Sequence, residues 1–129
     1  GIGICPDLIV TSPYRRAEET ARILVDELRP RSPLVTCDFL TPGASVGPLV
    51  ECLRSAEADV CLVVGHMPDV ADFAASLLHR GAGIEVTFKK AAVCCISFGG
   101  MPAEGEGCLE WLLQPGQLRA LAGKRAGKR

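Results

Sequence analysis

Two short apolar segments, each followed at once by a helix-start signal, constrain the fold of this chain more than any other feature. Asp7–Thr11 is rich in β-branched residues, and Val60–Val64 is apolar at every position. Such segments are typical of buried strands, and a continuously apolar strand is typical of a parallel sheet covered on both faces. After the first segment, Ser12 offers a helix N-cap and Pro13 fits the first helical position. After the second segment, Pro68 likewise fits the first position of a helix. The sequence therefore predicts strand–helix alternation, the pattern of an α/β fold.

The pattern of apolar residues and breakers adds further elements of the same kind. The helix that begins at Pro13 is expected to be stopped by Pro30, because from Tyr14 onward apolar residues recur at helical spacing up to that proline. A second strand is expected at Leu34–Asp38, followed by a Pro/Gly loop and a shorter helix over Val46–Ala56. Another helix is expected to begin at Pro68.

The pattern changes after Gly81. Three strands without long helices between them are expected at Ile84–Phe88, Ala92–Phe98 and Cys108–Leu113, and the last two are expected to pair as a hairpin at one edge of the sheet. A short helix is expected at Gln117–Leu121. Residues 1–122 are then one domain, and residues 123–129 form a basic tail for which we expect disorder and exposure to solvent.

Composition excludes several classes of function. The chain has 129 residues, of which 48% are hydrophobic and 22% charged, which is ordinary for one globular domain. A net charge of −1 gives no field that would attract nucleic acid or an acidic membrane. No stretch approaches the roughly 18 apolar residues of a membrane span. We expect no nucleic-acid partner and no membrane partner.

Seven cysteines are many for this length, but they show no metal-binding spacing. There is no C-x-x-C pair and there are only two histidines, so a zinc site is poorly supported. The odd number of cysteines, several of them within apolar runs, favours buried, reduced thiols. Reduced thiols indicate a cytoplasmic location.

Polar residues follow both strand–helix junctions. Because the carboxyl ends of parallel strands meet at one rim of a sheet, Arg15, Arg16 and His66 should lie near each other there. Helix N-termini at this rim offer free N–H groups, and an arginine fork binds phosphate oxygens. Taken singly, each arginine is more often a solvated helix residue and His66 a structural one; His79, near a helix end, is expected to be structural. The spacing of these residues alone predicts an anion-binding α/β domain and no more specific function.

Four segments resemble one known family. Residues 11–21, T-S-P-Y-R-R-A-E-E-T-A, resemble the T-S-P-x-x-R-A-x-x-T-A motif of the histidine phosphatase superfamily, and residues 63–68 resemble its G-H-x-P motif. Residues 40–44, L-T-P-G-A, resemble a loop of the short SixA-like branch of phosphohistidine phosphatases, and residues 88–92 fit the layout of that branch. The resemblance covers nearly the whole chain in the right order.

The resemblance implies a phosphoglycerate mutase-like fold, with a mostly parallel sheet, helices on both faces and an antiparallel edge hairpin. It assigns two catalytic, phosphate-binding residues. Arg16 matches the arginine that clamps the phosphoryl oxygens, and His66 matches the histidine that contacts the phosphoryl group and stabilises charge in the transition state. Arg15 falls at a variable position and receives no role. The family's reaction requires no metal or other cofactor.

One departure from the family pattern is as informative as the matches. The family's first motif, R-H-G at the end of the first strand, supplies the nucleophilic histidine, and no Arg-His-Gly occurs in this sequence. We expect its strand and helix either in the native protein upstream or in another chain. Without that central strand, Val10 and Val64 are each expected to lose a neighbour, leaving backbone groups unpaired.

The expected function is hydrolysis of phosphohistidine on a partner protein, such as a phosphotransfer domain, through a phosphohistidine enzyme intermediate. The segments between elements are short, which suits a substrate displayed on a protein, and no carboxylate can be matched to the general acid of larger relatives. Two alternatives stay open. One is a non-catalytic module that binds phosphate or phosphohistidine. The other is a small-molecule phosphomonoesterase or mutase, which predicts a carboxylate near His66.

Overall fold

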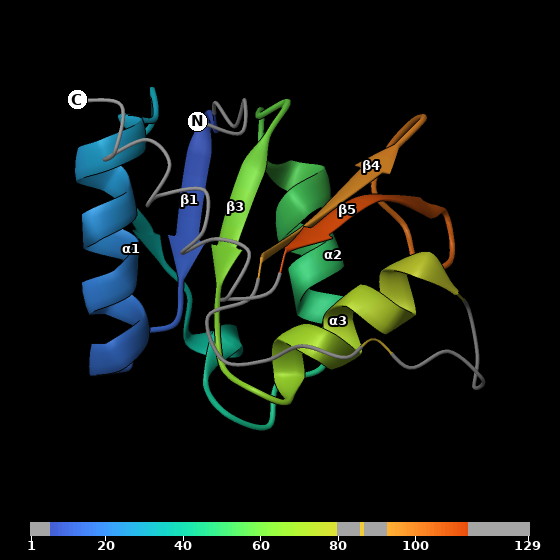
Figure 1. Cartoon of the computed structure of the whole chain (residues 1–129), viewed down its shortest axis with the longest axis horizontal. Coiled ribbons are helices and arrows are strands. Elements are labelled where there is room, and N and C mark those ends of the chain that lie inside the picture. The colour runs from blue at the N-terminus through green and yellow to red at the C-terminus, as the bar shows by residue number, and fades with distance from the viewer. Residues whose placement is uncertain (1–5, 80–85, 87–92, 114–129) are drawn as a thin grey trace. The chain divides into compact units, whose positions relative to one another are not determined.

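The computed structural model describes residues 6–79, 86 and 93–113 (Figure 1). The chain divides into two compact units, Gly1–Phe73 and Ala74–Arg129. The first holds a three-stranded parallel sheet with its helices, and the second holds an antiparallel hairpin. The α/β class expected from the sequence is confirmed.

The parallel sheet is centred on β1, Leu8–Thr11. β2, Val35–Thr36, pairs with one side of β1, and β3, Cys61–Val64, pairs with the other. The register aligns Val10 with Val35 and Val63. The expectation that Val10 would lack a neighbour is therefore wrong, because β1 is paired on both sides. Among the described residues, no strand pairs with the far side of β3.

The helices begin and end close to the expected residues. α1 is Arg15–Leu28, α2 is Val46–Ser55 and α3 is Asp69–Leu78. Arg29 closes α1 in the left-handed conformation, with φ of 47°, one residue before the expected proline stop. The second strand is shorter than expected, because a 3₁₀ turn, η1 (Asp38–Leu40), follows it and buries Leu40 to 1% exposure.

One helix start differs from the sequence-based expectation. Tyr14, not Ser12, is the N-cap residue of α1, and its side chain makes no capping hydrogen bond. Ser12 instead extends the line of β1, because its N–H donates to the carbonyl of Val64 (3.0 Å). Its side chain is fully buried. The pairing with β3 outweighs the local capping preference of a serine before a proline.

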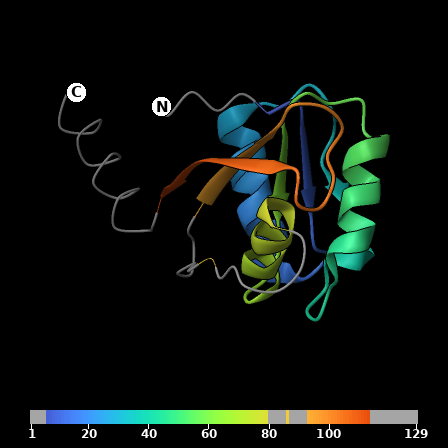
Figure 2. The ribbon, with the colours of Figure 1, turned by 90° about the vertical axis from the view of Figure 1, so that its right-hand side faces the viewer.

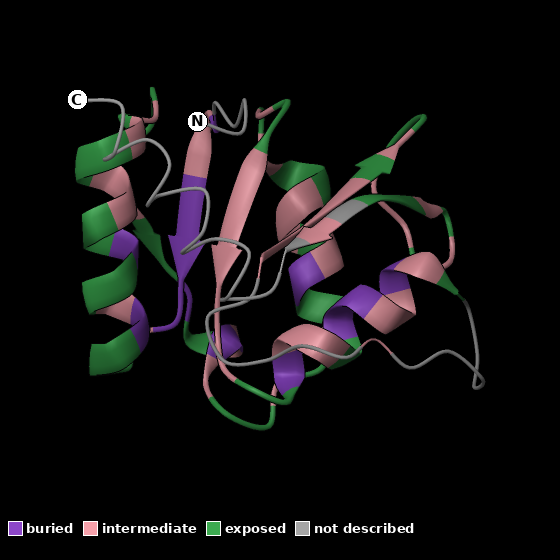
Figure 3. Cartoon of the chain, viewed as in Figure 1, coloured by how far each residue is buried: buried purple, intermediate pink, exposed green. Residues whose placement is uncertain are grey.

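In the first unit, helices cover both faces of the sheet, with β1 and β3 between α1 and α2 (Figure 2). Ile9 and Val10 are both fully buried, and adjacent strand residues point to opposite faces. Val10 joins a core cluster with Leu40, Leu49 of α2 and Phe73. Figure 3 shows the burial concentrated along β1 and the inner sides of the helices. All four residues of β3 are half-buried, so this strand is less deeply buried than β1.

The second unit contains the expected hairpin. β4, Val93–Phe98, runs antiparallel to β5, Gly107–Leu113, with an irregularity between Cys95 and Ile96. A Cβ at Gly107 would lie 2.6 Å from Ile96 Cγ2, so only glycine fits there. The strand expected at Ile84–Phe88 lies outside the described residues except for Val86. The expected helix at Gln117–Leu121 and the tail at 123–129 lie wholly outside them.

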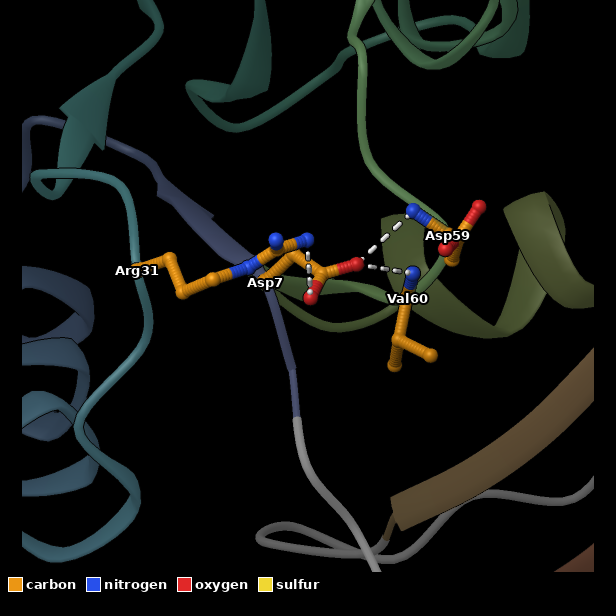
Figure 4. A network of polar contacts seen from close by, with 4 residues as sticks. All are labelled: Asp7, Arg31, Asp59 and Val60. Carbon is orange, nitrogen blue, oxygen red and sulfur yellow. Dashed lines mark hydrogen bonds and ion pairs between the residues drawn. The ribbon is translucent and has the colours of Figure 1, made fainter.

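The amino end of β1 is held by a polar network around Asp7 (Figure 4). One carboxylate oxygen accepts hydrogen bonds from the N–H groups of Asp59 (2.8 Å) and Val60 (3.1 Å). The other oxygen accepts from Arg31 Nη2 (2.9 Å). The N–H donors of Val60 and Asp59, helped by Arg31, hold the pKa of Asp7 below its usual value. Asp7 thus joins the chain before β3 and the chain after α1 to the start of the central strand.

The described cysteines, Cys37, Cys52, Cys61, Cys94, Cys95 and Cys108, are all free thiols. Burial raises the pKa of Cys37 to about 11 and that of Cys61 to about 12, and the neighbouring Cys52 adds to both shifts. Burial likewise raises the pKa of Cys94 to about 11. These values favour protonated thiols that act as apolar core groups. No helix among the described residues has the length and apolarity needed to cross a membrane.

Candidate functional site

The ends of β1 and β3 bring the two sequence motifs into direct contact. The parallel register aligns Thr11 with Val64, so the residues that follow each strand emerge side by side. Ser12 Oγ and His66 Nε2 lie 2.7 Å apart, which is hydrogen-bonding distance. The structure therefore joins T-S-P to G-H-x-P through two side chains that are 54 residues apart in sequence.

Ser12 makes two polar contacts from a buried position. Its side-chain oxygen also accepts a hydrogen bond from the N–H of Tyr14 (3.2 Å). A hydroxyl has one hydrogen and two lone pairs, so after this bond it retains a donor and one acceptor position. The tautomer of His66 then determines whether the Ser12 hydroxyl donates a hydrogen bond to Nε2 or accepts one from it. Ser12 in turn fixes the direction of the imidazole ring.

Tyr14 flanks the same histidine. The two ring centroids are 5.3 Å apart and the rings are inclined at 66°, an edge-to-face arrangement of aromatic groups. The tyrosine is 54% exposed although it contacts a half-buried residue. Its ring thus forms an exposed border beside His66.

Arg16 lies in the first turn of α1 and is exposed. The neighbouring Arg15 is bound to Glu19, with 2.9 Å between Nε and Oε1. The Arg16 side chain makes no hydrogen bond or ion pair within the described residues, and only its carbonyl is engaged, by the Thr20 hydroxyl. Nor does it contact His66 within them. The placement leaves the Arg16 guanidinium available for an anion, whereas Arg15 already has a partner.

A buried carboxylate lies close to His66 in sequence. Asp69, the first residue of α3, is 5% exposed. Its Oδ2 accepts hydrogen bonds from the N–H groups of Gly43 (2.9 Å) and Ala44 (3.2 Å). No carboxylate contacts the His66 ring within the described residues. Over the same residues, no group of three or more His, Cys, Asp or Glu side chains is arranged to hold a metal ion.

The motifs point to His66 and Arg16 but not to Ser12 and Tyr14, which contact His66, or to Asp69, which binds the loop at Gly43 and Ala44. The sequence predicts Ser12 as a helix cap, and Tyr14 occupies a variable motif position. The other histidine, His79, lies at the end of α3, where its N–H donates to the Ala75 carbonyl (2.9 Å). It makes no described contact with this site.

Comparison with solved structures identifies the fold that carries this site. A solved structure described as the protein histidine phosphatase SixA complexed with tungstate superposes with a TM-score of 0.72. The two chains are 25% identical, and the match covers 86% of this chain and 70% of the other. The chain thus has the SixA-like histidine phosphatase fold, and this similarity supports a function of the histidine phosphatase class.

Sequence comparison adds one relative of unknown role. An uncharacterized protein of Picosynechococcus sp. (strain PCC 7002) is 34% identical over 102 residues, which cover 76% of this chain. The chain spans 61% of the length of that relative. No protein-family model matches the sequence.

Proposed function

We propose that this chain is part of a phosphohistidine phosphatase in which Arg16 and His66 bind the phosphoryl group. The observation that carries the proposal is the 2.7 Å contact between Ser12 and His66, which joins two motifs at the carboxyl rim of a parallel sheet. The likeness to SixA supports it, because that protein was solved with tungstate, a tetrahedral oxyanion comparable to phosphate.

The proposed roles follow from the chemistry of the side chains. Phosphoryl transfer needs positive charge around the equatorial oxygens more than it needs a strong acid or base. Arg16 supplies a fixed charge that can contact two of these oxygens. His66, oriented by Ser12, contacts a third. The exposed ring of Tyr14, packed against His66, suits contact with the imidazole of a substrate histidine.

The reaction itself proceeds in two steps. A histidine nitrogen attacks phosphorus, a new P–N bond forms, and the bond to the substrate histidine breaks as that imidazole leaves with the electron pair and takes up a proton. Water then attacks the phosphohistidine intermediate and releases phosphate. The 129 residues contain no Arg-His-Gly, and the proposal assigns the nucleophile to a histidine of such a motif supplied from outside this sequence.

Within the residues that the structure describes, His66 bonds to a hydroxyl and to no carboxylate, which fits a phosphoramidate substrate. A sugar or other alcohol leaving group needs protonation by a dedicated acid, whereas an imidazole nitrogen is itself basic. Asp69 is engaged with two backbone N–H groups, which favours a role as acceptor rather than as proton donor. This weighs against the small-molecule phosphomonoesterase or mutase. A module that binds phosphohistidine without turnover remains the second candidate.

Anion binding tests the site directly. We expect calorimetry to detect tungstate and phosphate binding by the wild-type chain. Arg16→Ala should weaken binding at least tenfold, which corresponds to about 1.4 kcal/mol and is typical of one lost charge-assisted hydrogen bond. Arg15→Ala is the matched control, since that arginine already pairs with Glu19, and it should change affinity less than twofold. Equal losses in both variants would contradict the assignment of Arg16.

Turnover separates the two candidates. We expect the 129-residue chain to release no phosphate from a phosphohistidine-bearing protein above the level of a His66→Ala control. Release above that control would mean that the chain holds its own nucleophile. Activity that appears when a segment carrying an R-H-G motif is supplied would support the phosphatase, and binding without activity under those conditions would support the non-catalytic module.

A further inference from the structure

We infer that Asp69 is a positioning residue, which holds the loop at residues 41–44 against the turn that carries His66. This inference rests on the proposed function only for its consequence on anion binding. The loop and the turn are joined by one carboxylate oxygen, which accepts two hydrogen bonds from consecutive backbone N–H groups. The partners are 25 and 26 residues away in sequence, so the contact is tertiary.

The loop has a shape that presents both N–H groups to the same acceptor. Gly43 has φ of +90°, a conformation that glycine adopts at little cost and other residues adopt with strain. A Cβ at this position would meet no atom within 4 Å, so the backbone angle, and not crowding, favours glycine. Next to it, Ala44 packs against the core cluster. One end of the contact is therefore anchored to the protein interior.

The other end of the contact is tied to His66. The N–H of Val70 donates to the His66 carbonyl (2.9 Å), which makes the histidine part of the turn that opens α3. Val70 Cγ1 also lies 3.1 Å from the place that a Cβ on Gly65 would occupy. The chain around His66 is thus packed closely against the residue that follows Asp69. Loss of the carboxylate would release this turn from the loop.

Burial indicates that the carboxylate is held in place for these contacts. Asp69 is 5% exposed, and carboxylates are rarely buried without partners. Asp72 lies in the same first turn of α3 but is exposed, and no contact of its side chain with the loop is found among the described residues. Both residues affect the helix dipole in the same way. Asp72→Ala therefore serves as a matched control for charge at this helix end.

The test compares Asp69→Ala, Asp69→Asn and Asp72→Ala with the wild type by NMR. In Asp69→Ala we expect amide exchange of Gly43 and Ala44 to accelerate at least tenfold, and the imidazole ¹⁵N shifts of His66 to move as its tautomer ratio changes. Asp69→Asn retains a carbonyl acceptor of the same shape and should restore most of both signals. Asp72→Ala should leave both unchanged.

These readouts distinguish positioning from general stability. If Asp69→Ala accelerates exchange throughout the chain or leaves the His66 shifts in place, Asp69 is merely structural and the inference is wrong. Tungstate affinity is measured on the same samples, and we expect it to fall about tenfold in Asp69→Ala. If the wild type binds no tungstate, the proposed function fails while the exchange and ¹⁵N data still decide the role of Asp69. If it binds and Asp69→Ala binds equally well, the positioning role alone is refuted.

Discussion

Replacement of Ser12 by alanine removes the only side-chain hydrogen bond between the two motifs within the described residues. The hydroxyl is fully buried and contacts His66 Nε2 at 2.7 Å and the Tyr14 N–H at 3.2 Å. Each hydrogen bond contributes about 0.5–1.5 kcal/mol net, and a buried group left without a partner costs about 1–3 kcal/mol. Tyr14 is exposed and water can replace one bond, so we expect a total loss of about 2 kcal/mol.

Urea unfolding followed by circular dichroism measures this loss. With a slope of about 2 kcal/mol/M, the midpoint should fall by about 1 M. Ser45→Ala is the matched control, because Ser45 is an exposed serine before α2 whose side chain makes no capping hydrogen bond. That variant should stay within about 0.5 kcal/mol of the wild type.

A double-mutant cycle isolates the contact itself. If the hydrogen bond carries the effect, Ser12→Ala should cost about 1 kcal/mol less in a His66→Ala background than in the wild type, since the partner is already absent. Equal costs in both backgrounds would mean that the loss comes from the space left by the hydroxyl. A midpoint shift no larger than that of Ser45→Ala would refute the reasoning altogether.

Two further predictions concern groups away from the site. Because the folded pKa of Asp7 lies below its ordinary value of 3.8, its stabilisation is complete above about pH 5 and is lost as the pH falls through the folded pKa. The difference in urea midpoint between the wild type and Asp7→Asn should thus be constant from pH 7 to about pH 5 and shrink as the pH falls further. A difference that grows as the pH falls would contradict this. With pKa values of about 11 and 12, Cys37 and Cys61 should resist brief iodoacetamide treatment of the native chain at pH 8, while the exposed Cys108 reacts. Mass spectrometry of peptides measures the labelling of each cysteine. Rapid labelling of Cys37 would contradict the prediction and would mean that the core around this thiol opens readily.

The main elements were predictable because local signals and tertiary packing agree. Apolar β-branched runs followed by proline marked the ends of β1 and β3, and the observed α1 begins at Arg15, two residues after the expected first helical residue, Pro13. Where tertiary contacts compete with local preference, the prediction failed. Ser12 has a strong capping preference, but its backbone pairs with Val64 and its hydroxyl bonds to His66.

The site was predictable only as far as the motifs reach. The resemblance named His66 and Arg16, and the parallel register explains why the first of these meets the T-S-P segment. The bond between Asp69 and the loop joins residues 25 and 26 positions apart, and no spacing rule relates them. The role of Tyr14 depends on the exposure of its ring and on its contact with His66. Neither property can be predicted from an aromatic residue that follows a proline in the sequence.

The order of the strands determines when this site can form during folding. β1 pairs with β3 in parallel, and the paired residues Leu8 and Cys61 are 53 positions apart. Parallel pairing of this kind requires a large loop to close before any contact compensates for the lost entropy. Ser12 and His66 stand at the end of that pairing. Their contact can form only when this loop has closed, and during synthesis only after His66 has left the ribosome. A chain shortened before His66 would retain T-S-P and α1 in sequence and have no site at all.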